Sequence, residues 1–478
     1  MSVTLNDWIA RVERRETHVA IIGLGYVGLP LALLFAEEGI RVIGFDIDPE
    51  KVATLNAGRS YIHRIEPAHI AAAQAAGFKA TTDISQLHAC DAVLICVPTP
   101  LHPDHTPDMS FVNSTLEALA PHTRPGQLIV LESTTYPGTT SEIVVPILER
   151  LGPSGSSVGR DEGSGSRAQG PGSRAQGPGS RAQGPEREGL AGPLAVDPIP
   201  SLLVAFSPER EDPGNTMPRR AIPKVIGGIS ADASKAAAAL YGTIFDRTVV
   251  VSSTEAAEMT KLLENIYRVV NIALVNELKQ LCLAMGIDIW EVIDAASTKP
   301  FGFQAFYPGP GIGGHCIPVD PFYLSWRARQ FNQPTRFIEL AGEINEAMPG
   351  FVLRTIERAL EREQKSLAGA KILILGMAYK RDVDDLRESP ALTLFDLLER
   401  ADAQVAYNDP FFPTVGRGRR YKLETASTPL DEVPAFDCVV LVTDHSAYDI
   451  PALVAASRLF VDTRNATQGL TSPNIIRC

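Results

Sequence analysis

The sequence predicts an α/β protein in which two doubly wound parallel sheets are joined by one long central helix. Short apolar runs, which are typical of buried strands, alternate with helical patterns from residue 18 onward and again from residue 371. A continuous helical pattern, Thr254–Met285, separates these two regions. The 478 residues are enough for two or three domains. We therefore expect domains at residues 1–253, 254–365 and 366–478.

The first domain begins with a glycine motif between two apolar runs. His18–Ile22 is followed at once by Gly23-x-Gly25-x-x-Gly28, then by a helical pattern and by a second strand, Arg41–Phe45, which ends at Asp46. Strand, glycines, helix, strand and acid in this order predict a dinucleotide-binding, Rossmann-like unit. The alternative is a β-α-β unit with only a structural role.

Each part of this motif has a physical task. Gly23 permits a tight turn, Gly25 lets backbone N–H groups reach a pyrophosphate, and Gly28 lets the helix pack on the strand. Asp46 would accept hydrogen bonds from an adenosine ribose, which favours NAD over NADP. Asp48 is the alternative residue for that role.

Three later strands each end in a polar segment. Residues 92–97 end in Pro98-Thr99-Pro100, residues 127–131 in Glu132–Gly138, and residues 202–206 in Ser207-Pro208-Glu209-Arg210. In an open parallel sheet, ligands bind outside the carboxyl ends of the strands. The hydroxyls of Thr99 and Thr134 are therefore candidates for contacting a cofactor or positioning water. The alternative role for each is to cap a turn.

An insertion interrupts the first domain. Residues 152–200 are rich in Gly, Pro and Ser, and the seven residues Gly-Ser-Arg-Ala-Gln-Gly-Pro occur three times, at 165–171, 172–178 and 179–185. This composition cannot bury a core, and Gly and Pro in every copy exclude a coiled coil. We expect a disordered surface insertion, with partner binding as the alternative role.

The central helix places two polar residues on one face. Thr254, Glu255 and Glu258 predict an acidic start, and Gly286 predicts the end. Lys261 and Asn265 are four residues apart, so their side chains lie one turn apart on the same face. An ammonium and an amide directed at one point can stabilise a developing oxyanion. The alternative is a solvated lysine and an asparagine that packs between helices.

A loop of four glycines and three prolines, Gly309–Pro321, carries a cysteine and a carboxylate, Cys316 and Asp320. These glycines and prolines exclude a regular helix and favour a rigid cradle that approaches a ligand closely. The alternative is a glycine-rich turn with an incidental thiol. Beside a dinucleotide site, a reactive cysteine makes aldehyde-level oxidation plausible: the thiolate attacks a carbonyl, a hydride leaves to NAD, and a thioester remains.

Composition narrows the class of protein. The net charge of −12 argues against a nucleic-acid partner. There is neither an apolar run long enough to span a membrane nor a signal-peptide pattern at the N-terminus, so we expect a cytoplasmic protein without a membrane partner. The six cysteines form no C-x-x-C pair, so neither a metal site nor a disulfide framework is predicted, and Cys316 is expected to be a free thiol.

The last domain repeats the strand pattern without a second complete glycine motif. Strands are predicted near residues 371–376, 404–407, 438–442 and 459–461. Lys380 follows the first of these strands, and Arg387 lies in Asp385-Leu386-Arg387-Glu388-Ser389-Pro390. As lone charges, both would be ordinary surface residues.

Six ordered motifs resemble those of the UDP-glucose/GDP-mannose dehydrogenase family along nearly the whole chain except the insertion. They are Gly23-x-Gly25-x-x-Gly28, Val97-Pro98-Thr99-Pro100, Glu132-Ser133-Thr134, Ser207-Pro208-Glu209-Arg210, Lys261-x-x-x-Asn265 and Gly313-Gly314-His315-Cys316-Ile317-Pro318-x-Asp320. Within the family, Ser207–Asn215 and Lys299–Phe303 look most like the UDP-N-acetyl-D-glucosamine 6-dehydrogenase branch. The UDP-glucose and UDP-N-acetylmannosamine branches are the near alternatives.

The resemblance implies roles for individual residues. Cys316 would be the nucleophile, Lys261 and Asn265 would hold the oxyanion, Asp320 and Thr134 would activate or position water, and Glu209 would assist proton transfer. The cofactor site would comprise Gly23, Gly25, Tyr26, Val27, Gly28, Asp46, Lys51, Pro98, Thr99, Thr134 and Arg387. The substrate site would comprise Glu209, Arg210, Lys261, Asn265, Gly313 and Lys380. The family's second glutamate falls on Pro213, so Glu211 or Asp212 would have to replace it.

The implied reaction is the four-electron oxidation of C6 of a UDP-sugar to a uronic acid, with two NAD consumed. The resemblance also implies a homodimer or a higher homo-oligomer. A two-electron hydroxyacid dehydrogenase is the first alternative, since it would use the Lys261 and Asn265 pair but no cysteine. A non-catalytic nucleotide-binding scaffold that uses the repeat insertion is the second.

Overall fold

The computed structural model describes most of the chain, and two open sheets account for most of its core. The described residues are 4–62, 65–102, 104–153, 157–160, 201–210, 217–314, 320–417 and 422–478. The predicted disordered insertion falls largely on residues 161–200, outside the described residues, as do Cys316, His315, Glu211, Asp212 and Pro213.

The first sheet has eight strands in the order β3-β2-β1-β4-β5-β6-β7-β8. They are β1 His18–Ile22, β2 Arg41–Phe45, β3 Lys79–Thr81, β4 Ala92–Ile95, β5 Leu128–Leu131, β6 Leu203–Phe206, β7 Lys224–Gly228 and β8 Thr248–Val250. The first six follow the order 3-2-1-4-5-6 of a dinucleotide-binding sheet, with the topological switch point between β1 and β4. β7 pairs antiparallel to β6. The predicted doubly wound sheet is confirmed.

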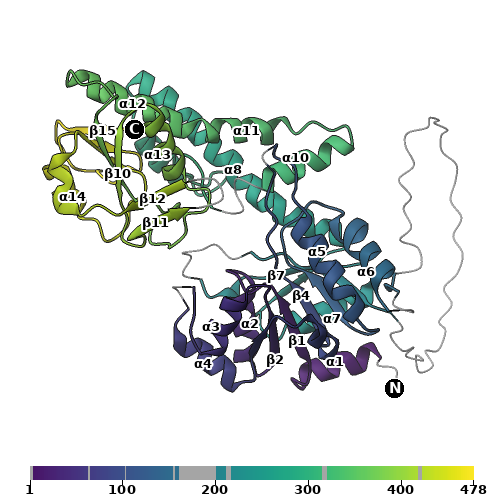
Figure 1. Cartoon of the computed structure of the whole chain (residues 1–478). Helices are drawn as coiled ribbons and strands as arrows, with labels where there is room; N and C mark the ends of the chain where they lie inside the picture. Colours follow the sequence, from purple (N-terminus) through teal and green to yellow (C-terminus); the bar gives the residue numbers. More distant parts are fainter. Residues whose placement is uncertain are drawn as a thin grey trace, which may run out of the picture.

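Helices cover both faces of this sheet (Figure 1), so its central strands are apolar throughout. The helices are α1 Leu5–Glu13, α2 Gly28–Glu37, α3 Pro49–Asn56, α4 Pro67–Ala75, α5 Ser110–Leu119, α6 Val145–Leu151 and α7 Ala231–Tyr241. One core contains α2 and α7, and the other contains α5 and α6. Packing on both faces fixes the position of the strand ends at which the candidate site lies.

The central helix α8 spans Thr254–Met285, as predicted, and runs diagonally between the two sheets (Figure 1). It ends at Gly286, whose φ of 71° is the left-handed conformation that glycine adopts most readily. The predicted acidic start is only partly right, because the N-cap is Ser253, whose side chain accepts a hydrogen bond from the Ala256 N–H. Glu258 is buried rather than solvated at the helix start.

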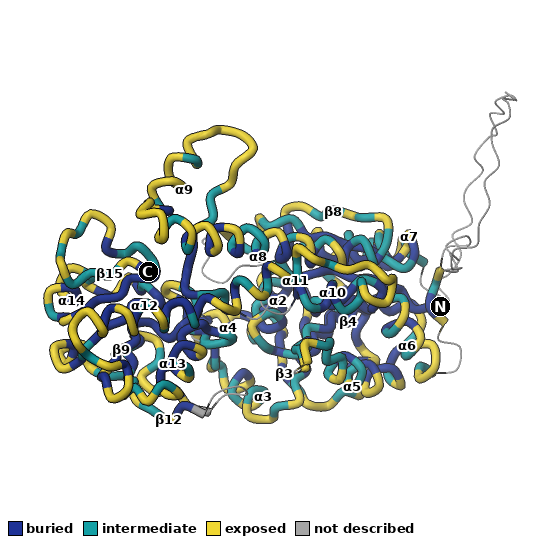
Figure 2. The backbone as a smooth tube through the Cα atoms, turned by 90° about the horizontal axis from the view of Figure 1, so that it is seen from above, coloured by how far each residue is buried: buried dark blue, intermediate teal, exposed yellow. Residues whose placement is uncertain are grey.

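Four further helices follow α8. They are α9 Ile289–Ser297, α10 Asp320–Gln330, α11 Arg336–Glu346 and α12 Met348–Arg362. α10 and α11 pack along α8, whereas α9 and the chain beside it stand off the body of the molecule (Figure 2). α12 packs into the core of the second sheet and so links the helical layer to it.

The second sheet has five parallel strands in the order β10-β9-β13-β14-β15. They are β9 Lys371–Leu375, β10 Gln404–Asn408, β13 Cys438–Leu441, β14 Phe460–Asp462 and β15 Ile475–Arg477. The helices α13 Pro390–Arg400 and α14 Ile450–Ala456 accompany them, together with a separate hairpin of β11 Thr414–Arg417 and β12 Lys422–Ala426. Neither β15 nor the hairpin was predicted from the sequence.

Within the described chain, no helix is long and apolar enough to cross a membrane.

Candidate active site

The glycine motif forms a cradle at the switch point of the first sheet. Gly23 has a φ of 91°, and a Cβ there would lie 2.6 Å from the carbonyl oxygen of Cys96. A Cβ on Gly28 would lie 1.9 Å from the carbonyl oxygen of Gly23, so the start of α2 approaches the loop too closely for any side chain. A Cβ on Gly25, in contrast, would meet no atom within 4 Å. The middle glycine therefore leaves open space where a pyrophosphate would sit, and the residues fit a dinucleotide.

Asp46 lies at the end of β2, beside this loop. One of its carboxylate oxygens accepts a hydrogen bond from the Leu24 N–H at 2.9 Å, and the other accepts one from the Asp48 N–H at 3.0 Å. The Lys51 ammonium lies 3.7 Å from the same carboxylate. Asp48 instead caps α3, because its side chain accepts hydrogen bonds from the Glu50 and Lys51 N–H groups. The geometry thus favours Asp46 over Asp48 as the ribose acceptor.

Tyr26 and Arg387 form a contact between the glycine loop and the second sheet's domain. The Arg387 guanidinium lies 4.9 Å from the centroid of the Tyr26 ring, a distance suited to a cation–π contact. Asp385 holds the guanidinium, with its nearest oxygen at 2.6 Å. Tyr26 and Arg387, 361 positions apart in the sequence, are therefore joined in one place, as expected for a cofactor bound between domains.

Asp320, Asn265 and Lys261 form the buried centre of the site. They are 3%, 1% and 6% exposed, respectively. Asp320 is the first residue of α10, and its side chain accepts a short hydrogen bond from the Asn265 amide of α8. Burial raises the pKa of Asp320 to about 6, although Lys261, Asn265 and Arg268 act in the opposite direction. This carboxyl can therefore exchange a proton near neutral pH, which suits a general base.

Glu209 and Arg210 follow β6 and reach the same side of α8. Burial by itself raises the pKa of Glu209, but Lys224, Arg219 and Lys261 outweigh it and hold the pKa below its ordinary value. Glu209 is thus a carboxylate that interacts with the candidate oxyanion lysine. Arg210 binds Glu264 of α8 at 2.5 Å and the Pro223 carbonyl oxygen at 2.7 Å, so it ties the strand end to the helix.

A buried ion pair supports these strand ends. The Lys224 ammonium lies 2.5 Å from the Glu132 carboxylate and donates to the Pro208 carbonyl oxygen at 3.1 Å. Glu132 follows β5 and Pro208 follows β6, so one lysine fastens both polar segments. Burial raises the pKa of Glu132, although Lys224 opposes the shift. Next to this pair Thr134 is half-buried, whereas its neighbours Ser133 and Thr135 are buried.

The described part of the cysteine loop lies between α8 and the second sheet's domain. The Gly309 N–H donates to the Asn276 side chain at 2.9 Å, and the Gly314 N–H donates to the Arg387 carbonyl oxygen at 2.9 Å. A Cβ on Gly313 would lie 2.5 Å from the Cβ of Tyr379, which precedes Lys380. Arg387 and Tyr379, the residue before Lys380, therefore lie against the loop. Cys316 itself lies outside the described residues, between Gly314 and Asp320.

The segment that contains Pro98 and Thr99 contacts α10. Thr99 is buried, and the next residue, Pro100, accepts a hydrogen bond from the Tyr323 hydroxyl at 3.1 Å. Tyr323 is on α10, one turn after Asp320. The helix that begins with the candidate base therefore also contacts the segment after β4 that was predicted to meet the cofactor.

Sequence reasoning missed two residues that hold the loop after β5. Glu258 of α8 accepts hydrogen bonds from the Gly138 N–H at 2.6 Å, from the Thr140 N–H at 2.8 Å and from the Thr140 hydroxyl at 2.7 Å. Arg327 of α10 donates to the Pro137 carbonyl oxygen at 2.9 Å. The spacing of Glu258 from Lys261 places both on one helix face, and this was the available signal for Glu258.

Comparison with known proteins identifies similar chains. The models of the UDP-glucose/GDP-mannose dehydrogenase family match in three parts: the NAD-binding domain over residues 17–158, the central domain over 255–347 and the UDP-binding domain over 373–469. A UDP-N-acetyl-D-mannosamine dehydrogenase of Salmonella typhi is 34% identical over 462 residues, covering 94% of this chain and 98% of that one.

Two further similar proteins are also named as dehydrogenases of N-acetylated sugars. An NDP-N-acetyl-D-galactosaminuronic acid dehydrogenase of Ralstonia nicotianae is 33% identical and covers 93% of this chain and 95% of its own. The solved structure of a UDP-D-ManNAc dehydrogenase from Pyrococcus horikoshii has a TM-score of 0.75 and 30% identity, covering 95% of this chain and 97% of that chain.

Proposed function

Because the chain belongs to the UDP-glucose/GDP-mannose dehydrogenase family of NAD-dependent enzymes, we propose that it oxidises C6 of a UDP-N-acetylhexosamine to the uronic acid. The observation that carries the proposal is the buried contact between Asn265 and Asp320 beside Lys261. Burial raises the pKa of Asp320 to about 6, and Asp320 follows Cys316 by four residues in the sequence, which supports a proton-transfer group and two oxyanion donors at one site.

The proposed chemistry has two oxidations and one hydrolysis. NAD accepts a hydride in each oxidation. In the first, the C6 alcohol loses a hydride and a proton and becomes an aldehyde. The Cys316 thiolate then attacks C6, and the thiohemiacetal loses a second hydride to leave a thioester. Water attacks the thioester, the thiolate leaves, and the carboxylate is released, so one sugar and one water give two NADH and three protons.

The described residues supply positioning and proton transfer in this scheme. Lys261 and Asn265 would donate to the oxygen on C6 whenever it carries negative charge. Asp320 would take a proton from the attacking water, since its raised pKa allows it to gain and release protons near pH 6. Glu209, held ionised by its lysine and arginine neighbours, would assist proton transfer during hydrolysis. Thr134 would position the water.

The proposal also concerns which epimer of the UDP-N-acetylhexosamine is the substrate. The segments Ser207–Asn215 and Lys299–Phe303 resemble the UDP-N-acetyl-D-glucosamine 6-dehydrogenase branch, so the first candidate is the gluco epimer, UDP-N-acetyl-D-glucosamine. The names of several relatives instead specify the manno epimer, which is the second candidate. An epimer differs only in the direction of one substituent, so the shape of the pocket decides between them rather than any single motif.

The test is the number of NADH formed per sugar consumed, with UDP-N-acetylglucosamine, UDP-N-acetylmannosamine and UDP-glucose offered separately. We expect two NADH with one of the N-acetyl sugars and loss of uronate formation in Cys316→Ser. Two NADH with UDP-glucose alone would keep the mechanism and change the sugar. One NADH with every sugar, or full uronate formation by Cys316→Ser, would contradict the cysteine mechanism and favour a two-electron dehydrogenase.

We also propose that a second copy of this chain is the partner of α8. Leu274, Leu278, Leu281 and Met285 are exposed on α8 and recur at the spacing of one helix face. An apolar stripe on a soluble helix marks an interaction surface, and the same stripe on a second copy would cover it.

A further inference from the structure

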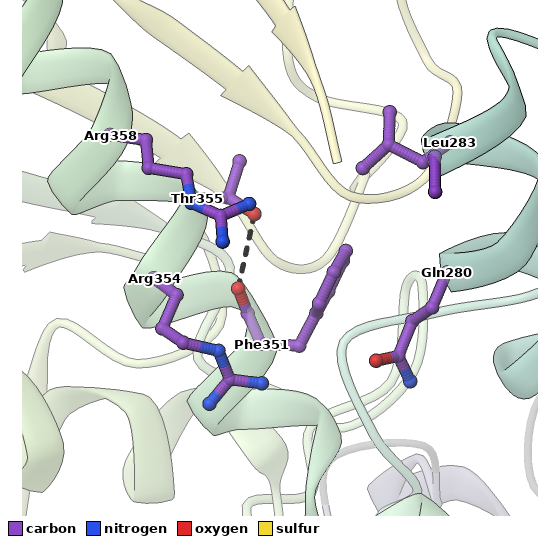
Figure 3. A pocket seen from close by; sticks show the side chains of 7 residues that line it. Gln280, Leu283, Phe351, Arg354, Thr355 and Arg358 are labelled. Carbon is purple, nitrogen blue, oxygen red and sulfur yellow. Dashed lines mark hydrogen bonds between the residues drawn. The ribbon is translucent and has the colours of Figure 1, made fainter.

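A cavity separates the end of α8 from α12, away from the candidate active site. Its volume is about 320 Å³, and its lining consists of Gln280, Leu283, Ala284, Phe351, Arg354, Thr355 and Arg358. Figure 3 shows Arg354 and Arg358 on the α12 side, Gln280 and Leu283 on the α8 side, and Phe351 and Thr355 between them. The cavity therefore lies between the central helix and the helix that packs into the core of the second sheet.

Positive charge gathers around this cavity. Arg354 and Arg358 lie one turn apart on α12, and neither forms an ion pair with the described residues. Lys279 precedes Gln280 on α8 and is only 4% exposed. Its ammonium lies 6.0 Å from the centroid of the Phe351 ring that lines the cavity, and it has no hydrogen-bond partner within the described chain. Two exposed arginines without an ion pair in the described chain, beside a buried lysine, make this cavity a candidate anion site.

The burial of Lys279 has an energetic consequence. An ammonium without a hydrogen-bond partner is costly to bury, and burial accordingly lowers the pKa of Lys279. Cys478 and Asp462 raise this pKa, whereas Arg464 lowers it further. An anion bound near Phe351 would add a further negative charge close to this lysine.

The rest of the lining limits what the anion can be. Leu283, Ala284 and the Phe351 ring are apolar, so they suit a ring or another flat apolar group. Gln280 and Thr355 add polar atoms; the Thr355 hydroxyl donates to the Phe351 carbonyl oxygen at 3.0 Å. Guanidinium groups spaced by one turn suit phosphate, which each can bind in a bidentate manner. The lining thus matches a phosphate-bearing molecule with an apolar ring.

This cavity is distinct from both surfaces described above. Gln280 and Leu283 lie on a different face of α8 from the stripe Leu274, Leu278, Leu281 and Met285, because successive helical residues are rotated by about 100°. Lys261 lies about 33 Å from Leu283 along the axis at a rise of roughly 1.5 Å per residue. A ligand in the cavity would therefore contact neither the proposed catalytic residues nor the proposed dimer stripe.

We propose that this cavity is a second ligand site, which binds a small phosphate-bearing molecule through Arg354 and Arg358 and joins the end of α8 to α12. The phosphate can come from an inorganic anion or from a nucleotide, and both have the charge that the arginines recognise. Since α8 carries Lys261 and Asn265, and α12 belongs to the core of the second sheet, the ligand would hold the central helix to the second sheet's domain.

The test is calorimetric titration of the full chain, with its dinucleotide cradle first filled by saturating NAD, with inorganic pyrophosphate and, separately, with AMP, at matched ionic strength. The double variant Arg354→Gln/Arg358→Gln is compared with Arg362→Gln, which removes an exposed arginine of the same helix outside the cavity. We expect saturable binding that is weakened on the order of a hundredfold in the double variant and unchanged in Arg362→Gln. Circular dichroism of each variant confirms that the helices are retained.

Equal affinity in the wild type and the double variant would assign the binding to another site and overturn the proposal, as would the absence of saturable binding with both probes. Tighter binding of AMP than of pyrophosphate supports the ring-binding role of Phe351 and Leu283; the reverse order overturns that part. Lys279→Met is the second variant. It is expected to raise the unfolding temperature without ligand and to weaken binding of the probe, and the opposite result would contradict the role of Lys279.

Discussion

The side chain of Asn265 on α8 donates a hydrogen bond to the carboxylate of Asp320, the residue that begins α10. The two residues are 55 positions apart, yet both are buried. The contact joins the helix that carries Lys261 to the segment that follows Cys316. It therefore sets the relative position of the proposed oxyanion donors and the proposed base.

Replacing Asp320 with Asn tests that base. An asparagine keeps an oxygen that can accept the Asn265 hydrogen bond, so we expect the fold to be retained while kcat falls by on the order of 10² to 10⁴ with little change in KM. Steady-state kinetics together with a thermal unfolding curve measure both effects. A fall of less than about tenfold in kcat at unchanged stability would remove Asp320 from proton transfer.

The pKa of Asp320 also predicts a pH profile. Burial raises this pKa to about 6, so the carboxyl is protonated below that pH and cannot accept a proton from water. We expect kcat to fall as the pH decreases through about 6 in the wild type, and this limb to be absent from the residual activity of Asp320→Asn. If the variant retained the same acidic limb, another group would be responsible for it.

Glu258 is expected to stabilise the loop after β5. It accepts three hydrogen bonds from Gly138 and Thr140. In Glu258→Gln an amide N–H group replaces one acceptor and faces a backbone N–H group, so the free energy of unfolding measured below pH 5, where Glu258 contributes fully, should fall by about 1–3 kcal/mol. Glu255→Gln is the matched control, because it alters a half-buried neighbour that accepts a hydrogen bond from Ser141. It should lower the free energy of unfolding by less than Glu258→Gln does. Chemical denaturation measures both.

Glu258 also makes stability depend on pH in a defined direction. Burial raises its pKa from 4.5 to about 8 in the folded protein, despite the three hydrogen bonds it accepts. The folded state then holds this proton over a range in which the unfolded state has lost it, so the contribution to stability is fully present below 4.5 and is lost as the pH rises through about 8.

Between pH 4.5 and about 8 the free energy of unfolding falls by about 1.4 kcal/mol per pH unit. Denaturation at pH 6 and at pH 8 should therefore show a larger loss of stability for the wild type than for Glu258→Gln, which cannot ionise. Equal losses in the two proteins would mean that Glu258 is already ionised when folded.

From the contact between Arg387 and Tyr26 we expect the second sheet's domain to contribute to NAD binding. Their contact places a guanidinium over the ring beside the glycine loop. In Arg387→Ala we expect the KM for NAD to rise about tenfold, since a partly buried cation–π contact is worth about 1 kcal/mol and a phosphate contact would add to it. Arg381→Ala, which removes an exposed arginine bonded to Asp444, is the control. An unchanged KM for NAD would remove Arg387 from the cofactor site.

The exposed apolar stripe on α8 predicts that a charged residue placed in it would weaken the proposed dimer. Leu278→Glu would place a carboxylate in the apolar surface between two copies, so we expect light scattering with size-exclusion chromatography to show a lower mass than for the wild type. Leu340→Glu changes an exposed leucine of α11 and should leave the mass unchanged. A monomeric wild type, or an unchanged mass in Leu278→Glu, would contradict the proposed dimer.

The structure also shows why some features were accessible to sequence reasoning. The central helix was predicted at both ends because its apolar pattern is long and Gly286 can adopt the left-handed conformation that ends a helix. β15 was missed because Ile475–Arg477 is a three-residue edge strand, too short for a clear pattern. Glu258 was assigned to the helix start because a carboxyl near a helix N-terminus is usually solvated.

By itself, the sequence determined the class of fold, the glycine cradle for NAD and the family, because these depend on local patterns that hold in any β-α-β unit. Only the tertiary structure decided that Asn265 meets Asp320, that Arg387 covers Tyr26 and that Glu258 holds Gly138 and Thr140. These contacts join residues far apart in the chain. They follow from how helices pack on sheets and on one another, and they bury carboxyls whose pKa values no spacing rule reports.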